Sequence, residues 1–174
     1  MPDTDGSWRP NRPMSNLLCP ICGKHFGDGE PRYRRRDGDV HVSCFKGPRV
    51  LVVDDDMILR DLVVRLVRRD RFCQVDTVSS GQAALEQLRI HAYDLILSDL
   101  RMPEMDGPTF YRRMQVEYPD HVGRIVFMTS QVEHYAQFIR DVGAPVLSKP
   151  FPREDLDAIL TRMIGPTRSQ REAK

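Results

Sequence analysis

Four short apolar runs along this chain each end on polar side chains, and this feature constrains the fold more than any other. The runs and the side chains that follow them are 50–53 with Asp54, Asp55 and Asp56; 95–98 with Asp99; 124–128 with Thr129; and 145–148 with Lys149. In an open parallel sheet the carboxyl ends of the strands form one edge, where binding sites are built. The pattern therefore predicts a group of acids, a hydroxyl and an ammonium group at one sheet edge.

Helical patterns alternate with these runs and with a further short strand over 75–78. Asp56 is placed to cap a helix over 57–69, whose apolar face is Ile58, Leu59, Leu62, Val63, Leu66 and Val67. A third helix should bury Phe110, Met114 and Val116, and a fourth should be lined by Val132, Tyr135, Ala136, Ile139 and Val142 before it ends at Gly143. Five such βα units predict an α/β fold with a five-stranded, doubly wound parallel sheet.

The converging acids indicate phosphoryl chemistry. Clustered carboxylates such as Asp54, Asp55 and Asp99 repel one another, and Mg²⁺ is the hard cation that oxygen ligands of this kind prefer. An aspartate can then act as a nucleophile and form an acyl phosphate, which makes Asp99 the candidate phosphoacceptor. Lys149 would pair with one phosphoryl oxygen, and Thr129 would hydrogen-bond another.

Residues 49–164 resemble the receiver domain of two-component response regulators. The resemblance is carried by Val-Val-Asp-Asp-Asp at 52–56, Leu-Ser-Asp-Leu-Arg-Met-Pro-Glu-Met-Asp-Gly at 97–107, Thr129-Ser130 and Lys149-Pro150-Phe151. It implies a flavodoxin-like fold and phosphorylation of Asp99 by a histidine kinase or a phosphotransfer protein. It also implies Mg²⁺ bound by Asp55 and Asp99, with Asp54 acting through water and Arg101 through its main-chain carbonyl. A cis bond at Lys149-Pro150 is a further implication.

One position departs from the receiver pattern. Receivers usually carry an aromatic residue three positions before the lysine, where it switches between outward and inward positions, and here that residue is Val146. The usual readout of phosphorylation is therefore in question. A scaffold that keeps the fold without being phosphorylated stays open as an alternative, although Asp99, Thr129 and Lys149 weigh against it.

Residues 17–48 carry a second metal-ligating pattern. Cys19 and Cys22 form one pair, His41 and Cys44 form another, and this spacing suits tetrahedral Zn²⁺. Four protein ligands leave no open position, so the predicted zinc is structural. A unit of this size cannot bury enough core alone, and a metal is its expected stabiliser. The pattern resembles the first half of a LIM-type finger.

Composition restricts the remaining classes of function. The chain has 174 residues and a net charge of +1, and residues 1–48 carry 8 basic against 6 acidic residues. This balance favours a protein partner over nucleic acid, although Arg34 to Arg36 keep a nucleic-acid-binding transcriptional regulator as the alternative. No apolar run approaches the ~20 residues that span a bilayer. With no apolar signal core at the N-terminus, we expect a cytoplasmic protein without membrane contact.

We expect tails at 1–16 and 165–174, with the zinc finger and the receiver domain between them. The segment after Met163 is too short for a catalytic or DNA-binding effector. The chain is therefore predicted not to be an enzyme, and to act through contact with a downstream protein partner.

Overall fold

A computed structural model describes residues 18, 23–25, 32–33, 40–41, 47–69, 71 and 73–165. The chain divides into two compact units, Met1–Lys46 and Gly47–Lys174. In the first unit, strands β1 (Arg32–Tyr33) and β2 (Val40–His41) pair in antiparallel fashion, with Arg32 opposite His41. No helix in the described part of the chain has the length and apolar character that crossing a membrane requires.

The second unit is built on a five-stranded parallel sheet, as the alternating pattern predicts. Its strands are β3 (Arg49–Val53), β4 (Gln74–Val78), β5 (Leu95–Asp99), β6 (Ile125–Thr129) and β7 (Val146–Ser148). They lie in the order β4-β3-β5-β6-β7, so the chain moves outward from β3 in both directions. The carboxyl ends of β3 and β5 are neighbours at the centre of this order, which brings their terminal side chains together.

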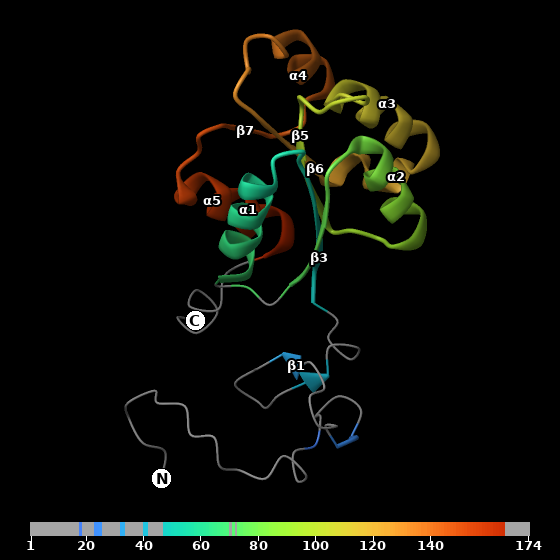
Figure 1. Ribbon diagram of the computed structural model, residues 1–174, viewed down its shortest axis with the longest axis vertical. Helices are drawn as coiled ribbons and strands as arrows, with labels where there is room; N and C mark the ends of the chain where they lie inside the picture. Colours follow the sequence, from blue (N-terminus) through green and yellow to red (C-terminus); the bar gives the residue numbers. More distant parts are fainter. Residues whose placement is uncertain are drawn as a thin grey trace. The chain divides into compact units, whose positions relative to one another are not determined.

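Helices cover both faces of the sheet (Figure 1). They are α1 (Met57–Arg69), α2 (Gly81–Ile90), α3 (Gly107–Glu117), α4 (Ala136–Val142) and α5 (Arg153–Ile164), with a 3₁₀ turn over Pro119–Arg124. Val50 and Val52 of β3 belong to the core cluster that contains α1 and α5, whereas Leu51 and Val53 belong to the cluster that contains α2 and α3. This alternation follows from the two-residue period of a strand, and residues 50–53 of β3 are completely buried on both faces.

Short polar side chains fix where the helices begin. Asp56 Oδ1 accepts from the main-chain N–H groups of Ile58 and Leu59, at 2.8 and 3.2 Å, which confirms the predicted cap of α1. Ser80 caps α2, and Asp106 caps α3 by accepting from Thr109 N–H at 2.9 Å. Asp56 and Ser80 lie two or three residues beyond the ends of β3 and β4, and Asp106 lies seven residues beyond the end of β5, so all three caps follow the carboxyl ends of strands.

Two predicted helix faces and one predicted helix start differ from the observed ones. On α1, Ile58 and Leu62 are 77% and 49% exposed, because the sheet and α5 cover only the stripe around Val63 and Val67. On α3, Val116 is 84% exposed, since residues 110, 111 and 114 form the buried face. The fourth helix begins at Ala136 rather than near Val132, and no side-chain cap hydrogen bond is found at its start.

A buried histidine gives the second unit a pH-dependent stability. His121 is 8% exposed, and its Nε2 accepts from the main-chain N–H of Tyr93 at 3.2 Å, which requires a neutral ring. Burial and the charge of Arg124 lower the pKa of His121, against an opposing effect of Asp120. Below about pH 6.5 this histidine takes up a proton more readily in the unfolded chain than in the folded chain. The free energy of unfolding therefore falls as the pH falls below that value.

We expect His121→Gln, which keeps a neutral acceptor, to lose less stability than the wild type as pH falls from about 7 to about 5. Each unit by which the two pKa values differ is worth about 1.4 kcal/mol. Urea unfolding at several pH values measures the effect, and His134→Gln at an exposed histidine is the control. Parallel pH profiles for wild type and His121→Gln would refute this assignment.

Candidate functional site

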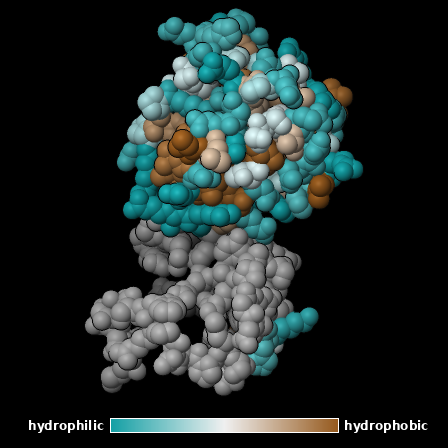
Figure 2. Space-filling model, in the orientation of Figure 1, coloured by the Kyte–Doolittle hydropathy of each residue, from teal (hydrophilic) through white to brown (hydrophobic). Residues whose placement is uncertain are grey.

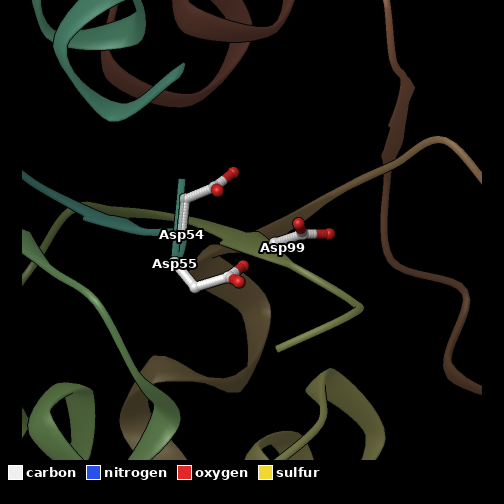
Figure 3. A group of neighbouring side chains, drawn as sticks. All are labelled: Asp54, Asp55 and Asp99. Carbon is white, nitrogen blue, oxygen red and sulfur yellow. The ribbon is translucent and has the colours of Figure 1, made fainter. Parts of the chain in front are cut away.

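Three carboxylates meet at the carboxyl edge of the sheet. Asp54 and Asp55 directly follow β3, and Asp99 is the last residue of the neighbouring strand β5. One carboxylate oxygen of each lies within 4.8 Å of the others. Figure 3 shows the side chains projecting to the same side from the two strand ends. Asp54 is fully buried, Asp99 is 9% exposed, and Asp55 is exposed, so the group opens to solvent on one side.

Lys149 joins two of these carboxylates. It follows β7, and its Nζ donates to Asp54 Oδ2 at 2.6 Å and to Asp99 Oδ2 at 2.7 Å. Its main-chain N–H donates to Thr129 O at 2.7 Å, which continues the pairing of β6 with β7. The peptide bond between Lys149 and Pro150 is cis, as the resemblance implies. The ammonium group thus lies where it can contact a group attached to Asp99.

The remaining predicted side chains surround Asp99. Thr129 is 1% exposed at the end of β6, and its Oγ1 accepts from Gln131 N–H at 3.0 Å, which leaves the hydroxyl proton available for donation. The main-chain N–H of Arg101 donates to Asp99 Oδ1 at 3.1 Å. This bond places Arg101 beside the acid group, while the role of its carbonyl as a metal ligand stays a prediction.

The charges of the site favour a divalent cation. Burial raises the pKa of Asp54, although the hydrogen bond and charge of Lys149 and the N–H of Asp56 oppose the shift. One ammonium group faces three carboxylates, so the cluster keeps an excess of negative charge when the acids are ionised. Hard oxygen donors at this spacing fit Mg²⁺ better than a softer metal. The residues present therefore fit the cation that the sequence predicts.

Sequence reasoning missed one basic group beside the acids. Arg60, at the end of the first turn of α1, donates from Nη1 to the main-chain carbonyl oxygen of Asp54. The sequence could have placed Arg60 near the strand end, six residues after Asp54, but a bond to a main-chain carbonyl leaves no pattern in the side chains.

The predicted zinc ligands Cys19, Cys22 and Cys44 lie outside the described residues. His41 belongs to β2, where only its main chain is described. The zinc site therefore stays a prediction from spacing.

Comparisons with known proteins point to one family. The family model of the response regulator receiver domain matches residues 50–161. Transcription factor SKN7 of Saccharomyces cerevisiae is 34% identical over 160 residues, which covers 89% of this chain and 22% of SKN7. Transcriptional regulatory protein ZraR of Escherichia coli is 32% identical over 120 residues, covering 69% of this chain and 27% of ZraR. The chain thus spans about a quarter of the length of these two relatives.

One similar solved structure has the same fold and contains a metal ion. The receiver domain of sensor histidine kinase PA1611 from Pseudomonas aeruginosa superimposes with a TM-score of 0.62 at 27% identity. The match covers 68% of this chain and 98% of the other. That structure has a magnesium ion coordinated in its active site cleft. The similarity therefore extends from sequence to fold over the second unit.

Proposed function

This chain belongs to the response regulator receiver domain family, and we propose that it accepts a phosphoryl group on Asp99 from a histidine kinase or a phosphotransfer protein. The observation that carries the proposal is the pair of hydrogen bonds from Lys149 to Asp54 and Asp99, within a group of three carboxylates. The ammonium group contacts the proposed nucleophile, Asp99, at a position where it would stabilise the negative charge of an incoming phosphoryl group.

The transfer needs no general base. A carboxylate oxygen of Asp99 attacks the phosphorus of a phosphohistidine, and a new O–P bond forms as the P–N bond of the donor breaks. The histidine nitrogen keeps the electron pair of the broken bond. Lys149 binds one phosphoryl oxygen, and Thr129 donates its hydroxyl proton to another. The N–H of Arg101 holds the carboxylate in place.

Asp54, Asp55 and Asp99 would hold Mg²⁺, with the main-chain carbonyl of Arg101 as a further ligand and Asp54 acting through water. The bound cation would neutralise charge on the transferring phosphoryl group. The closeness of the three carboxylates supports this set, together with the magnesium in the similar Pseudomonas aeruginosa structure.

Phosphoryl uptake should therefore depend on the cation. We expect the wild type to gain one phosphoryl group from acetyl phosphate in Mg²⁺ and none in EDTA, as measured by intact mass. Asp55→Asn should need far more Mg²⁺, because it removes one negative charge from the cluster. Asp61→Asn, at an exposed acid on α1, is the matched control and should behave as wild type. Equal phosphoryl uptake in Mg²⁺ and in EDTA would exclude the proposed role of the cation.

The kinase or phosphotransfer protein would dock on α1. Met57, Ile58 and Leu62 are 64%, 77% and 49% exposed, and the helix starts directly after the acids of the site. Figure 2 shows brown, hydrophobic atoms gathered on the part of the surface where Figure 1 places α1 and α5. An apolar patch beside the phosphoacceptor suits a partner that must bring its phosphohistidine to Asp99.

We expect Ile58→Lys to slow phosphotransfer from the protein donor by about tenfold or more, since hot-spot residues are worth about 2 kcal/mol or more. Uptake from acetyl phosphate should not change, because the substitution alters an exposed side chain of α1 that has no proposed role in holding the phosphoryl group or the cation. Ile90→Lys is the matched control: Ile90 is 60% exposed and ends α2 at the opposite edge of the sheet. Equal transfer rates for the two variants would place the docking surface elsewhere.

Residues 17–48 would form a structural zinc finger that contacts a downstream protein partner. The spacing of Cys19, Cys22, His41 and Cys44 supports the metal, and the weak charge of this segment supports a protein partner over nucleic acid.

We expect purified wild-type protein to contain about one zinc per chain, and Cys22→Ser to contain far less, because the substitution removes one of the four proposed ligands. Elemental analysis by mass spectrometry measures the metal. Cys73→Ala is the control, since Cys73 is a buried thiol just before β4 in the other unit. A Cys22→Ser protein that retains its zinc would disprove this ligand set.

A further inference from the structure

Arg60 connects α1 to the end of β3, where Asp54 and Asp55 lie. Its side chain is half-buried, and Nη1 donates to the main-chain carbonyl oxygen of Asp54. Its own N–H donates to Asp56 O at 2.9 Å, which is an ordinary bond of the helix. The same residue therefore holds both ends of the turn 54–56 through main-chain oxygens.

Hydrogen bonds fix the rest of this turn. Asp54 N–H donates to Val78 O at 3.2 Å, Asp56 N–H donates to Asp54 Oδ1 at 2.9 Å, and Asp56 caps the helix. Asp55 is the exposed member of the acid group, between two anchored neighbours. The direction of its carboxylate therefore depends on the peptide groups on either side, and Arg60 binds one of them.

We propose that Arg60 is a positioning residue for the cation site: by holding the carbonyl of Asp54, it fixes the turn that aims Asp54 and Asp55 at Asp99. The inference rests on the proposed function, because it concerns the affinity of the same acids for Mg²⁺. Removing a residue that hydrogen-bonds to the direct ligands of a metal typically weakens metal binding by about 10- to 100-fold.

The positive charge of Arg60 should itself weaken Mg²⁺ binding, whereas its positioning role should strengthen it. The direction in which the Mg²⁺ affinity changes when Arg60 is replaced therefore tests the inference. A guanidinium group near three carboxylates repels a cation, so a role through charge alone predicts tighter Mg²⁺ binding when Arg60 is neutralised. A positioning role predicts weaker binding. A role limited to the stability of the helix predicts lower stability with unchanged affinity.

The experiment is calorimetric titration of Mg²⁺ into the full chain, with urea unfolding in EDTA as the second readout. We expect Arg60→Met to bind Mg²⁺ about tenfold more weakly. Arg60→Lys, which keeps a donor and the charge, should recover part of the loss. Arg65→Met, at an exposed arginine of the same helix, should match the wild type.

Unchanged or tighter binding by Arg60→Met would overturn the inference while leaving the proposed function in place. A wild type that does not bind Mg²⁺ would overturn both. If Arg60→Met does not fold, Arg60→Lys supplies the test. Lysine preserves the charge but not the geometry of the guanidinium donors, so a fall in its affinity supports positioning and an unchanged affinity refutes it.

Discussion

Lys149→Met should slow the uptake of phosphate by Asp99 about 10²- to 10³-fold, which is the usual cost of removing one group that stabilises developing charge. The wild-type ammonium group contacts Asp99, the proposed phosphoacceptor, at 2.7 Å. Methionine matches the length of the apolar part of lysine but carries no charge and no donor. The rate with acetyl phosphate, followed by intact mass over time, measures the loss.

The same variant should bind Mg²⁺ at least as tightly as the wild type. Lys149 neutralises part of the charge of Asp54 and Asp99, so its removal leaves the acid group more negative. A loss of phosphorylation with preserved metal binding separates this role from collapse of the site. Lys149→Arg is the conservative control and should keep part of the rate. A Lys149→Met protein phosphorylated at the wild-type rate would contradict the assignment.

Gly107→Ala should destabilise the second unit by about 1–3 kcal/mol, the usual cost of forcing extra atoms into a packed region. A Cβ at Gly107 would lie 2.8 Å from Leu100 Cα and 3.1 Å from Asp99 O. These are main-chain atoms, so no side-chain rotation can relieve the contact. The main-chain N–H of Gly107 also donates to Leu100 O at 2.8 Å, which ties the helix start to the segment after Asp99.

The added methyl group should therefore also weaken Mg²⁺ binding, since the displaced main chain carries Asp99 and Arg101. Gly123→Ala is the matched control, because a Cβ there meets no atom within 4 Å and its φ is not positive. That control should be neutral or slightly stabilising. Urea unfolding and metal titration together give both effects. Equal stability for the two variants would show that the main chain after Asp99 moves to accommodate the methyl group at little cost, and would contradict the prediction.

The sequence predicts the sheet, and the closeness of Asp54, Asp55 and Asp99 at its edge, because both follow from short-range patterns. Apolar runs of strand length define β3, β5 and β6, and their polar ends follow from chain order alone. Parallel strands bring such ends to one edge whatever the details of packing. The same reasoning could not tell that Lys149 reaches two acids at once, because that depends on the order of the strands.

Helix faces are less well predicted, since exposure depends on what covers each helix. Ile58 and Leu62 continue the apolar stripe of α1 but extend past the area that the sheet and α5 cover. Val116 lies about 120° round the helix from Phe110 and about 160° from Met114, which is outside the buried face. Arg60 and His121 went unassigned because each bonds to a main-chain atom.

The site of phosphorylation gives the most direct test of the central claim. The protein is treated with acetyl phosphate and Mg²⁺, reduced with borohydride, which converts an aspartyl phosphate to homoserine, and digested for tandem mass spectrometry. We predict homoserine at position 99 and unmodified aspartate at positions 54, 55 and 56. An unmodified Asp99, or homoserine at any other aspartate in its place, would contradict the account.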